Sequence, residues 1–243
     1  MEVVIRQHEQ QCGVTAADII ADAVACGATT LGLATGSSPL SVYRELIRRH
    51  RKGGLTFADV QAFLLDEYVG LPPGHPQSYA HVIRAEFTDH VGIASDRVHS
   101  PDGIAEDIFG AAQAYDALIT DAGPIDVQLL GIGANGHIGF NEPTRSVKAN
   151  THRAKLAAGT RRSNADLFGG RASDVPREAL SMGVGTILRS RQIVLIATGA
   201  GKSAAIRATV DGPITSRVPA SFLQLHGNVE LVLDSAAAGG RRR

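Results

Sequence analysis

The sequence predicts an α/β fold with a mainly parallel central sheet. Apolar runs of strand length alternate with segments of helix length, and no turn sequence typical of a β-hairpin separates them. Strands joined through helices form βαβ units, whose strands run parallel. The chain has 243 residues, 44% of them hydrophobic, which suffices for one large domain with a full core. It contains no internal repeat and no convincing linker, so we predict a single domain over residues 1–243.

Seven elements are predicted before residue 120. Apolar residues at helical spacing, with helix-capping residues at several ends, predict helices over residues 14–26, 39–51, 79–87 and 106–119. Short apolar runs predict strands over residues 29–34, over residues 60–65 and near Val98. We expect Ser38 to be the N-cap of the second helix, because Pro39 suits the first helical position.

The second half of the chain continues the alternation of predicted strands and helices, and one polar segment lies within it. Buried strands are predicted over residues 125–132, 192–198 and 229–233, and helices over residues 176–182 and from Lys202 to Val210. Residues 151–158 and a predicted helix over 161–168 are polar and poorly patterned, so we expect a mobile lid over about 151–182. The tail, 236–243, is expected to be disordered.

Composition limits the classes of function. Lys plus Arg and Asp plus Glu are both 24, which argues against a nucleic-acid surface but leaves room for a local basic patch. Cys12 and Cys26 form no C-x-x-C motif, so we expect reduced thiols in a cytoplasmic protein. The start of the chain is too polar for a signal peptide, and no apolar run approaches the length of a membrane span. We therefore expect neither nucleic acid nor membrane as a partner.

The stretch LLGIGANGHIGFNEP, residues 129–143, is the strongest candidate for an active site. It follows a predicted buried strand, and ligands of open α/β sheets bind outside the carboxyl ends of the strands. Its four glycines, Gly136 among them, let the backbone turn tightly and approach a ligand. His137 lies five residues before the carboxylate of Glu142. The alternative is that His137 merely caps a loop.

A dinucleotide site is a further alternative for the same stretch. Gly131, Gly133 and Gly136 match G-x-G-x-x-G. A helix should begin at the last glycine, but another glycine and Pro143 follow within a turn. The acidic residue expected about twenty positions later is also missing. The sequence therefore disfavours a nicotinamide site.

Four predicted strand ends carry polar loops, TGSSP, DEYVG, the central loop and TGAGK, which can converge at one edge of the sheet. In the first loop, Thr35, Gly36, Ser37 and Ser38 precede a helix whose free amides could bind phosphate. Lys202 could add a positive charge there. An ordinary strand–helix turn is the alternative for TGSSP, and GKS is not a Walker motif because residue 196 is not glycine.

Asp66 is the candidate base, because a carboxylate behind an apolar strand is partly desolvated and its proton affinity rises. Strand geometry should point Glu67 away from it. The alternative for Asp66 is a surface acid in a turn. The nine histidines lack the spacing of a metal site. The residues alone thus predict an enzyme acting on a small anionic, phosphorylated substrate, with Asp66, His137 and Glu142 transferring protons.

The motifs LLDEYVGLPPGHPQSY, GIGANGHIGFNEP, TRRSNAD and VPREALSMGVGTIL resemble those of the glucosamine-6-phosphate deaminase family. The resemblance runs from about Leu31 to Asp234 and implies a modified Rossmann-type α/β sandwich. It also implies conversion of glucosamine 6-phosphate and water into fructose 6-phosphate and ammonia, without metal or organic cofactor. Asp66 would carry the proton between C2 and C1, and His137 with Glu142 would open the sugar ring. The phosphate would lie against Ser37, Ser38 and Lys202.

The sequence departs from the family pattern at three places. Asn135 stands where some members have an aspartate that completes an Asp–His–Glu set, and Asp166 replaces an arginine that helps hold the phosphate. We expect Asn135 to shift the pH profile, and Asp166 to raise the KM for the phosphorylated sugar unless Arg161, Arg162 or Arg171 compensates. Hexameric, regulated members carry an arginine and a lysine at the positions of His152 and Ala154. We therefore expect an unregulated monomer or low-order homo-oligomer.

Three other functions stay open at this point. A 6-phosphogluconolactonase shares the general loop arrangement, although DEYVGL with NGHIGFNEP favours the deaminase. A non-catalytic sugar-phosphate sensor is disfavoured because the three proposed catalytic residues are retained and no helix-turn-helix precedes the domain. A deaminase of another or unphosphorylated amino sugar would explain Asp166.

Overall fold

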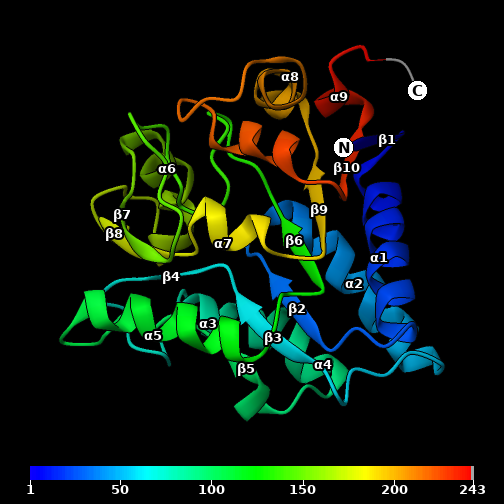
Figure 1. The fold of residues 1–243 in the computed structure, drawn as a ribbon, viewed down its shortest axis with the longest axis horizontal. Helices are drawn as coiled ribbons and strands as arrows, with labels where there is room; N and C mark the ends of the chain where they lie inside the picture. The colour runs from blue at the N-terminus through cyan, green and yellow to red at the C-terminus, as the bar shows by residue number, and fades with distance from the viewer. Residues whose placement is uncertain (242–243) are drawn as a thin grey trace.

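In the computed structural model, which describes residues 1–241, a seven-stranded sheet lies between two layers of helices (Figure 1). In spatial order its strands are β1 (Glu2–Arg6), β10 (Val229–Asp234), β9 (Gln192–Ala197), β6 (Val127–Leu130), β2 (Thr30–Leu33), β3 (Gln61–Leu64) and β5 (Val98–His99). All neighbouring strands are parallel. The predicted α/β sandwich with a mainly parallel sheet is therefore confirmed.

Each face of the sheet has its own apolar core. Within β9, Val194 and Ile196 belong to one core and Ile193 and Leu195 to the other, because successive side chains of a strand point to opposite faces. The first core is covered by α1 (Glu9–Ala25), α2 (Ser37–Lys52), α3 (Tyr79–Ile83), the π-helical η1 (Arg84–Thr88) and α4 (Asp89–Val91). The second is covered by α5 (Ile108–Asp121), α7 (Val184–Leu188), α8 (Ser203–Asp211), the 3-10 helix η5 (Pro219–Leu225) and α9 (Ser235–Ala238). Two further 3-10 turns are η2 (Ser95–Arg97) and η4 (Ala200–Lys202).

A second, antiparallel sheet lies beside the main one and corrects one prediction. Its strands are, in spatial order, β4 (Asp66–Tyr68), β8 (Glu178–Ser181) and β7 (His152–Lys155). The helix predicted over residues 176–182 is wrong, because this segment forms the central strand of the small sheet. Its Glu-Ala-Leu composition favours a helix locally, but pairing on both edges and burial of Ala179 and Leu180 override that preference.

The expected lid segment has defined secondary structure. Between β7 and β8 it forms α6 (Ala158–Ser163) and the 3-10 helix η3 (Ala165–Phe168), where one helix over 161–168 was predicted. Figure 1 shows α6 grouped with β7 and β8 beside the main sheet. Movement of this segment stays a prediction.

Most of the other predicted helices and strands are present, and they differ from the predictions mainly in the residues at which they begin and end. The edge strand β1 was missed, and α1 begins at Glu9 rather than at residue 14. The predicted helix over 79–87 is divided into α3 and η1. Residues 236–238 of the tail predicted to be disordered lie in α9, and residues 242–243 lie outside the described part.

The strand order reverses between β2 and β6, which defines where a ligand can bind. From β2 the sheet continues through β3 to β5, and from β6 it continues the other way through β9 to β10. Doubly wound sheets bind ligands at such a switch point, outside the carboxyl ends of the two strands. The loops that follow β2 and β6 here are TGSS and the glycine-rich central loop. Within residues 1–241, no helix has the length and apolar character needed to cross a membrane.

Candidate active site

The loops after β2, β6 and β9 contact one another at the switch point. Ser38 Oγ, in the first turn of α2 after β2, lies 3.1 Å from Thr198 Oγ1 in the loop after β9. Lys202 Nζ donates a hydrogen bond of 2.7 Å to the carbonyl of Ile132, which joins the loops after β9 and β6. Burial lowers the pKa of the Lys202 ammonium. The predicted convergence of these strand ends is therefore present.

The start of α2 has no side-chain cap. Gly36 precedes the helix with φ of +118°, a left-handed conformation that favours glycine, and no side chain caps the first turn. The predicted N-cap at Ser38 is wrong, because the helix begins at Ser37, two residues before Pro39, and its N-cap is Gly36. Ser37 is exposed, Thr35 is half-buried, and Ser38 is buried against Thr198. Free amides at the N-terminus of a helix favour a phosphate group.

Asp66 begins β4 and is linked to the central loop through β8. It pairs with Ser181 in the antiparallel sheet, and Ser181 Oγ accepts a hydrogen bond of 2.9 Å from the Phe140 amide. The ring of Phe140 lies 5.6 Å from that of Tyr68, at the other end of β4. The strand that carries Asp66 and the loop that carries His137 therefore pack together.

The Asp66 side chain is buried, and no hydrogen bond offsets the loss of solvent around its carboxylate within the described residues. Its residue is 6% exposed, and within residues 1–241 no hydrogen bond to the carboxylate is formed. Burial, and secondly the charge of Glu67, raise the pKa of Asp66 well above its usual range. The structure thus agrees with the predicted desolvation, and a carboxylate in this state has the proton affinity that a general base needs.

Glu67 has a structural role. One carboxylate oxygen accepts hydrogen bonds from the amides of Tyr68 and Tyr79, at 2.8 and 2.9 Å, and the other accepts one of 2.9 Å from the amide of Ala80. Two of these donors are free amides at the start of α3, so Glu67 caps this helix.

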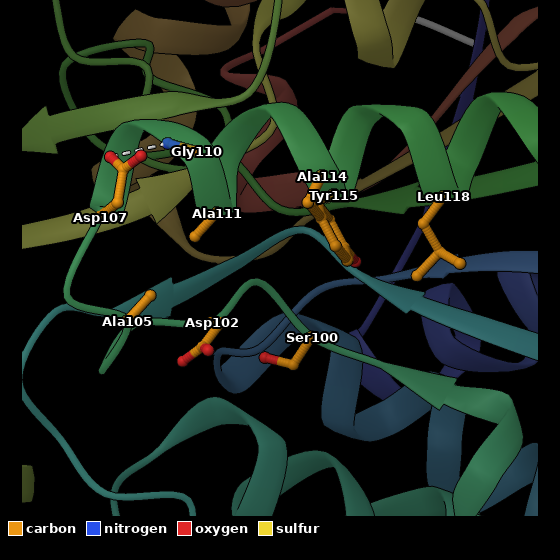
Figure 2. A pocket seen from close by; sticks show the side chains of 9 residues that line it. All are labelled: Ser100, Asp102, Ala105, Asp107, Gly110, Ala111, Ala114, Tyr115 and Leu118. Carbon is orange, nitrogen blue, oxygen red and sulfur yellow. Dashed lines mark hydrogen bonds between the residues drawn. The ribbon is translucent and has the colours of Figure 1, made fainter.

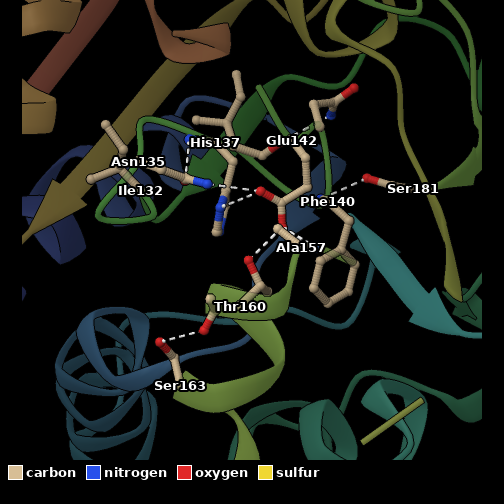
Figure 3. Close-up of polar contacts among 12 residues, drawn as sticks. Ile132, Asn135, His137, Phe140, Glu142, Ala157, Thr160, Ser163 and Ser181 are labelled. Carbon is tan, nitrogen blue, oxygen red and sulfur yellow. Dashed lines mark hydrogen bonds and ion pairs between the residues drawn. The ribbon is translucent and has the colours of Figure 1, made fainter. Parts of the chain in front are cut away.

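His137 and Glu142 lie together in the central loop (Figure 3). His137 Nδ1 is 3.4 Å from Glu142 Oε2, within ion-pair range but too far for a well-formed hydrogen bond. The imidazole lies directly on Gly133: a Cβ added there would be 2.2 Å from Cε1 of the ring. Glycine at 133 is therefore needed for the position of His137.

The Glu142 carboxylate is held by donors from two segments. Asn135 Nδ2 donates to Oε2 at 2.9 Å from within the loop. The amide of Ala157 donates to Oε1 at 3.2 Å, and the hydroxyl of Thr160 also donates to Oε1. Burial alone would raise the pKa of Glu142, but the close approach of His137 and the hydrogen bonds from Thr160 and Asn135 together lower it to about 2. Glu142 is therefore a carboxylate at neutral pH.

Asn135 contacts Glu142 and the backbone of the loop rather than the imidazole. Its Nδ2 donates to Glu142, and Oδ1 accepts a hydrogen bond of 3.3 Å from the backbone amide of His137. Asn135 therefore positions the partner of His137 rather than its ring.

Gly136 forms part of the loop scaffold. Its φ is +85°, and an added Cβ would lie 2.8 Å from Val218 Cγ1. Its carbonyl accepts a hydrogen bond of 2.9 Å from the amide of Ala220 in η5. A larger residue at 136 would separate the loop from η5.

Sequence reasoning assigned no role to Thr160, Tyr68 or Asn164, which join the lid segment to the site. Asn164 Nδ2 donates a hydrogen bond of 2.8 Å to the hydroxyl of Tyr68, and the Tyr79 hydroxyl lies 3.2 Å from the same oxygen. Burial raises the pKa of Tyr68 to about 12, so the phenol stays protonated. The available signals were TRRSNAD, which contains Thr160 and Asn164, and DEYVG, which contains Tyr68.

A separate hollow of about 410 Å³ lies between α5 and the loop before it (Figure 2). It is lined by Ser100, Asp102, Asp107, Tyr115 and Leu118, among others. None of the predicted site residues lines it. Among the described residues, no three His, Cys, Asp or Glu side chains are grouped so that they could hold a metal ion.

Comparison with known proteins places this chain in a family. A family model described as glucosamine-6-phosphate isomerases/6-phosphogluconolactonase matches residues 5–232. A glucosamine-6-phosphate deaminase of Rhodococcus opacus (strain B4) is 54% identical over 238 residues, which cover 98% of this chain and 92% of the relative. One of Arthrobacter sp. (strain FB24) is 53% identical over 249 residues, which cover 100% of this chain and 93% of the relative.

Similar solved structures agree with these sequence comparisons. The structure of a monomeric glucosamine-6-phosphate deaminase has a TM-score of 0.96 and 40% identity, with 99% of this chain and 100% of that chain covered. A 6-phosphogluconolactonase from Trypanosoma cruzi has a TM-score of 0.82 at 17% identity, covers 100% of this chain and 97% of that chain, and shares the fold alone. This chain belongs to the glucosamine-6-phosphate isomerase/6-phosphogluconolactonase family.

Proposed function

We propose that the protein is a glucosamine-6-phosphate deaminase, which converts glucosamine 6-phosphate and water into fructose 6-phosphate and ammonia. The observation that carries this proposal is the combination of a buried, unpaired Asp66 with a His137–Glu142 pair at one edge of the sheet. Relatives that are 54% and 53% identical bear this name, whereas the lactonase structure is 17% identical.

Ring opening is assigned to His137. The imidazole accepts the hydroxyl proton at C1 and delivers a proton to the ring oxygen of the sugar, which gives the open-chain aldehyde with no net gain or loss of protons. Glu142, a carboxylate at neutral pH, stabilises the imidazolium form of His137. A histidine paired with a carboxylate can donate and accept protons near neutral pH.

Isomerisation is assigned to Asp66. Its carboxylate removes the proton at C2 while the aldehyde oxygen gains a proton from solvent, so an enolamine forms, and Asp66 returns its proton to C1. The product is an imine at C2, to which water adds, and ammonia leaves as the ketone forms. The amino group of the substrate activates C2 itself, so we propose neither metal nor organic cofactor. The phosphate is proposed to bind at the start of α2, with Thr35, Gly36, Ser37, Ser38 and Lys202 around it.

The remaining assignments follow from the same proposal. The substrate is a small amino-sugar phosphate, and we propose a monomer or low-order homo-oligomer, supported by the monomeric relative of known structure. A cytoplasmic location is supported by the free thiols of Cys12 and Cys26.

One assay tests the function. Purified protein is given glucosamine 6-phosphate, free glucosamine or 6-phosphogluconolactone, and ammonia, fructose 6-phosphate and acid are measured. We expect ammonia and fructose 6-phosphate in equal amounts from the phosphorylated amino sugar. Hydrolysis of the lactone without ammonia release from either amino sugar would contradict the proposal.

Changing Asn135 to Asp is expected to move the acid limb of the kcat–pH profile to higher pH. The new carboxylate would stand where Asn135 Nδ2 lies 2.9 Å from Glu142 Oε2. Repulsion would raise the pKa of Glu142, about 2 in the wild type, by about 1 unit or more. Because Glu142 acts in its ionised form, activity should be lost earlier on acidification. Superimposable wild-type and variant profiles would disprove this role of Asn135.

Changing Asp166 to Arg is expected to lower the KM for glucosamine 6-phosphate. Asp166 is exposed in η3, while Arg161 donates to the carbonyl of Ala172 and Arg171 pairs with Asp174. Removing a negative charge and adding a positive one near a phosphate should lower KM about fivefold, the effect of a partly exposed ion pair. The KM for free glucosamine should not change. An unaltered KM for the phosphorylated sugar would show that Asp166 does not face the phosphate.

A further inference from the structure

Thr160 of the lid segment contacts the carboxylate that pairs with His137. It lies in α6, is 8% exposed, and directs its hydroxyl at Glu142 (Figure 3). The amide of Ala157, at the start of α6, donates to the same oxygen at 3.2 Å. Oε1 of Glu142 is therefore bound by the lid segment, and Oε2 by Asn135 and His137 of the central loop.

We propose that Thr160 is a positioning residue which couples the packed lid to ring opening. Its hydroxyl fixes Oε1 of Glu142 and so holds Oε2 next to His137. The proposal rests on the proposed function, because it assigns ring opening to His137. Thr160 itself need not touch the substrate.

The geometry of a carboxylate carries this coupling. The group is planar and rigid, so a hydrogen bond that fixes one oxygen also sets the place of the other. Both donors to Oε1 belong to the lid segment, and they leave together if the segment moves away. Glu142 would then keep only the loop contacts, of which the 3.4 Å approach to His137 is long.

Other contacts fix the position of α6, so that Thr160 lies next to Glu142. Asn164, which follows α6, bonds to the Tyr68 hydroxyl, and the ring of Phe168 packs edge-on against the same tyrosine at 5.5 Å. Tyr68 is in β4, the strand that begins with Asp66. The lid segment thus contacts β4, the strand that begins with Asp66, the proposed base. It also contacts Glu142, the partner of His137.

The test is the kinetics of Thr160→Val, which keeps the shape of the side chain and removes the hydroxyl. We expect kcat for glucosamine 6-phosphate to fall about 10- to 100-fold, as for loss of a hydrogen bond to a charged group. KM should change less than about threefold, because the phosphate contacts are elsewhere. Thr160→Ser should restore most of kcat. The matched control is Ser163→Ala, which removes a hydroxyl of the same helix that bonds to the Gly159 carbonyl.

A double-mutant cycle distinguishes positioning from a general loss of structure. If Thr160 acts through Glu142, Thr160→Val should cost less than about threefold in kcat when Glu142 is already Gln. An equal cost in both backgrounds, or a Thr160→Val enzyme as fast as wild type, would overturn the proposal.

A second variant keeps the test independent of position 160. Ala157→Pro removes the other donor to Oε1 at a residue whose φ is already −61°, and it should also lower kcat. If neither variant lowers kcat although the wild type deaminates the substrate, only the coupling is wrong. A wild-type protein that releases no ammonia would instead disprove the proposed function.

Discussion

Replacing Asp66 by Asn is expected to lower kcat about 1,000- to 10,000-fold, with little change in KM. The amide has the shape of the carboxylate but cannot accept the proton from C2. The phosphate and the ring-opening pair stay in place, so substrate should still bind. Steady-state kinetics with glucosamine 6-phosphate measure both constants. Activity within tenfold of wild type would show that another group is the base.

The same substitution should raise stability, in a way that depends on pH. The folded-state pKa of Asp66 is raised above its ordinary value near 3.8, because burial stabilises the protonated form of the carboxyl group relative to the charged form. Its contribution to stability is complete below that ordinary value and is lost as the pH rises through the folded-state pKa. The Asp66→Asn variant has no such loss. Its Tm should therefore match wild type near pH 4 and exceed it by about 3 °C near pH 8.

This stability measurement is also a control for the kinetic one. A variant that loses activity while its Tm rises has lost a chemical group and kept its fold. If the difference in Tm between the variant and the wild type instead decreases as the pH rises, the folded protein stabilises the charged form of Asp66. That result would contradict the effect expected from the burial of Asp66.

Replacing His137 by Gln is expected to lower kcat about 100- to 1,000-fold. Glutamine can still form hydrogen bonds, but it cannot deliver a proton to the ring oxygen. KM should change less than about threefold, because the phosphate contacts lie in other loops. His81→Gln, at an exposed position of α3, is the matched control and should keep wild-type activity.

An equal effect of both histidine substitutions would contradict the assignment of ring opening to His137. So would a His137→Gln variant whose loss is entirely in KM, since that result would make His137 a binding group.

Sequence patterns predicted the parts of this molecule that depend on local periodicity. The long apolar run of β9 and the apolar run before the central loop identified central strands, whose ends carry the site loops. Asp66 could be selected because its position after an apolar strand fixes its burial. Glu142 could be paired with His137 because both lie in one short, glycine-rich loop.

Contacts between distant segments could not be predicted in this way. The strand β8 has a composition that favours a helix, and only pairing with β4 and β7 makes it extended. Thr160 is eighteen residues from Glu142, and nothing in its neighbours indicates that it faces a carboxylate. The contact of Asn135 with Glu142, rather than with the imidazole, depends on side-chain directions that spacing does not determine.

The most direct test is a crystal structure of the Asp66→Asn variant with glucosamine 6-phosphate, which this variant should bind without converting it. We expect one sugar molecule with C2 beside the substituted side chain at position 66, its ring oxygen or O1 within hydrogen-bond distance of His137, and its phosphate at the start of α2. The account would be contradicted if position 66 and His137 opened into separate cavities, or if no single sugar touched both.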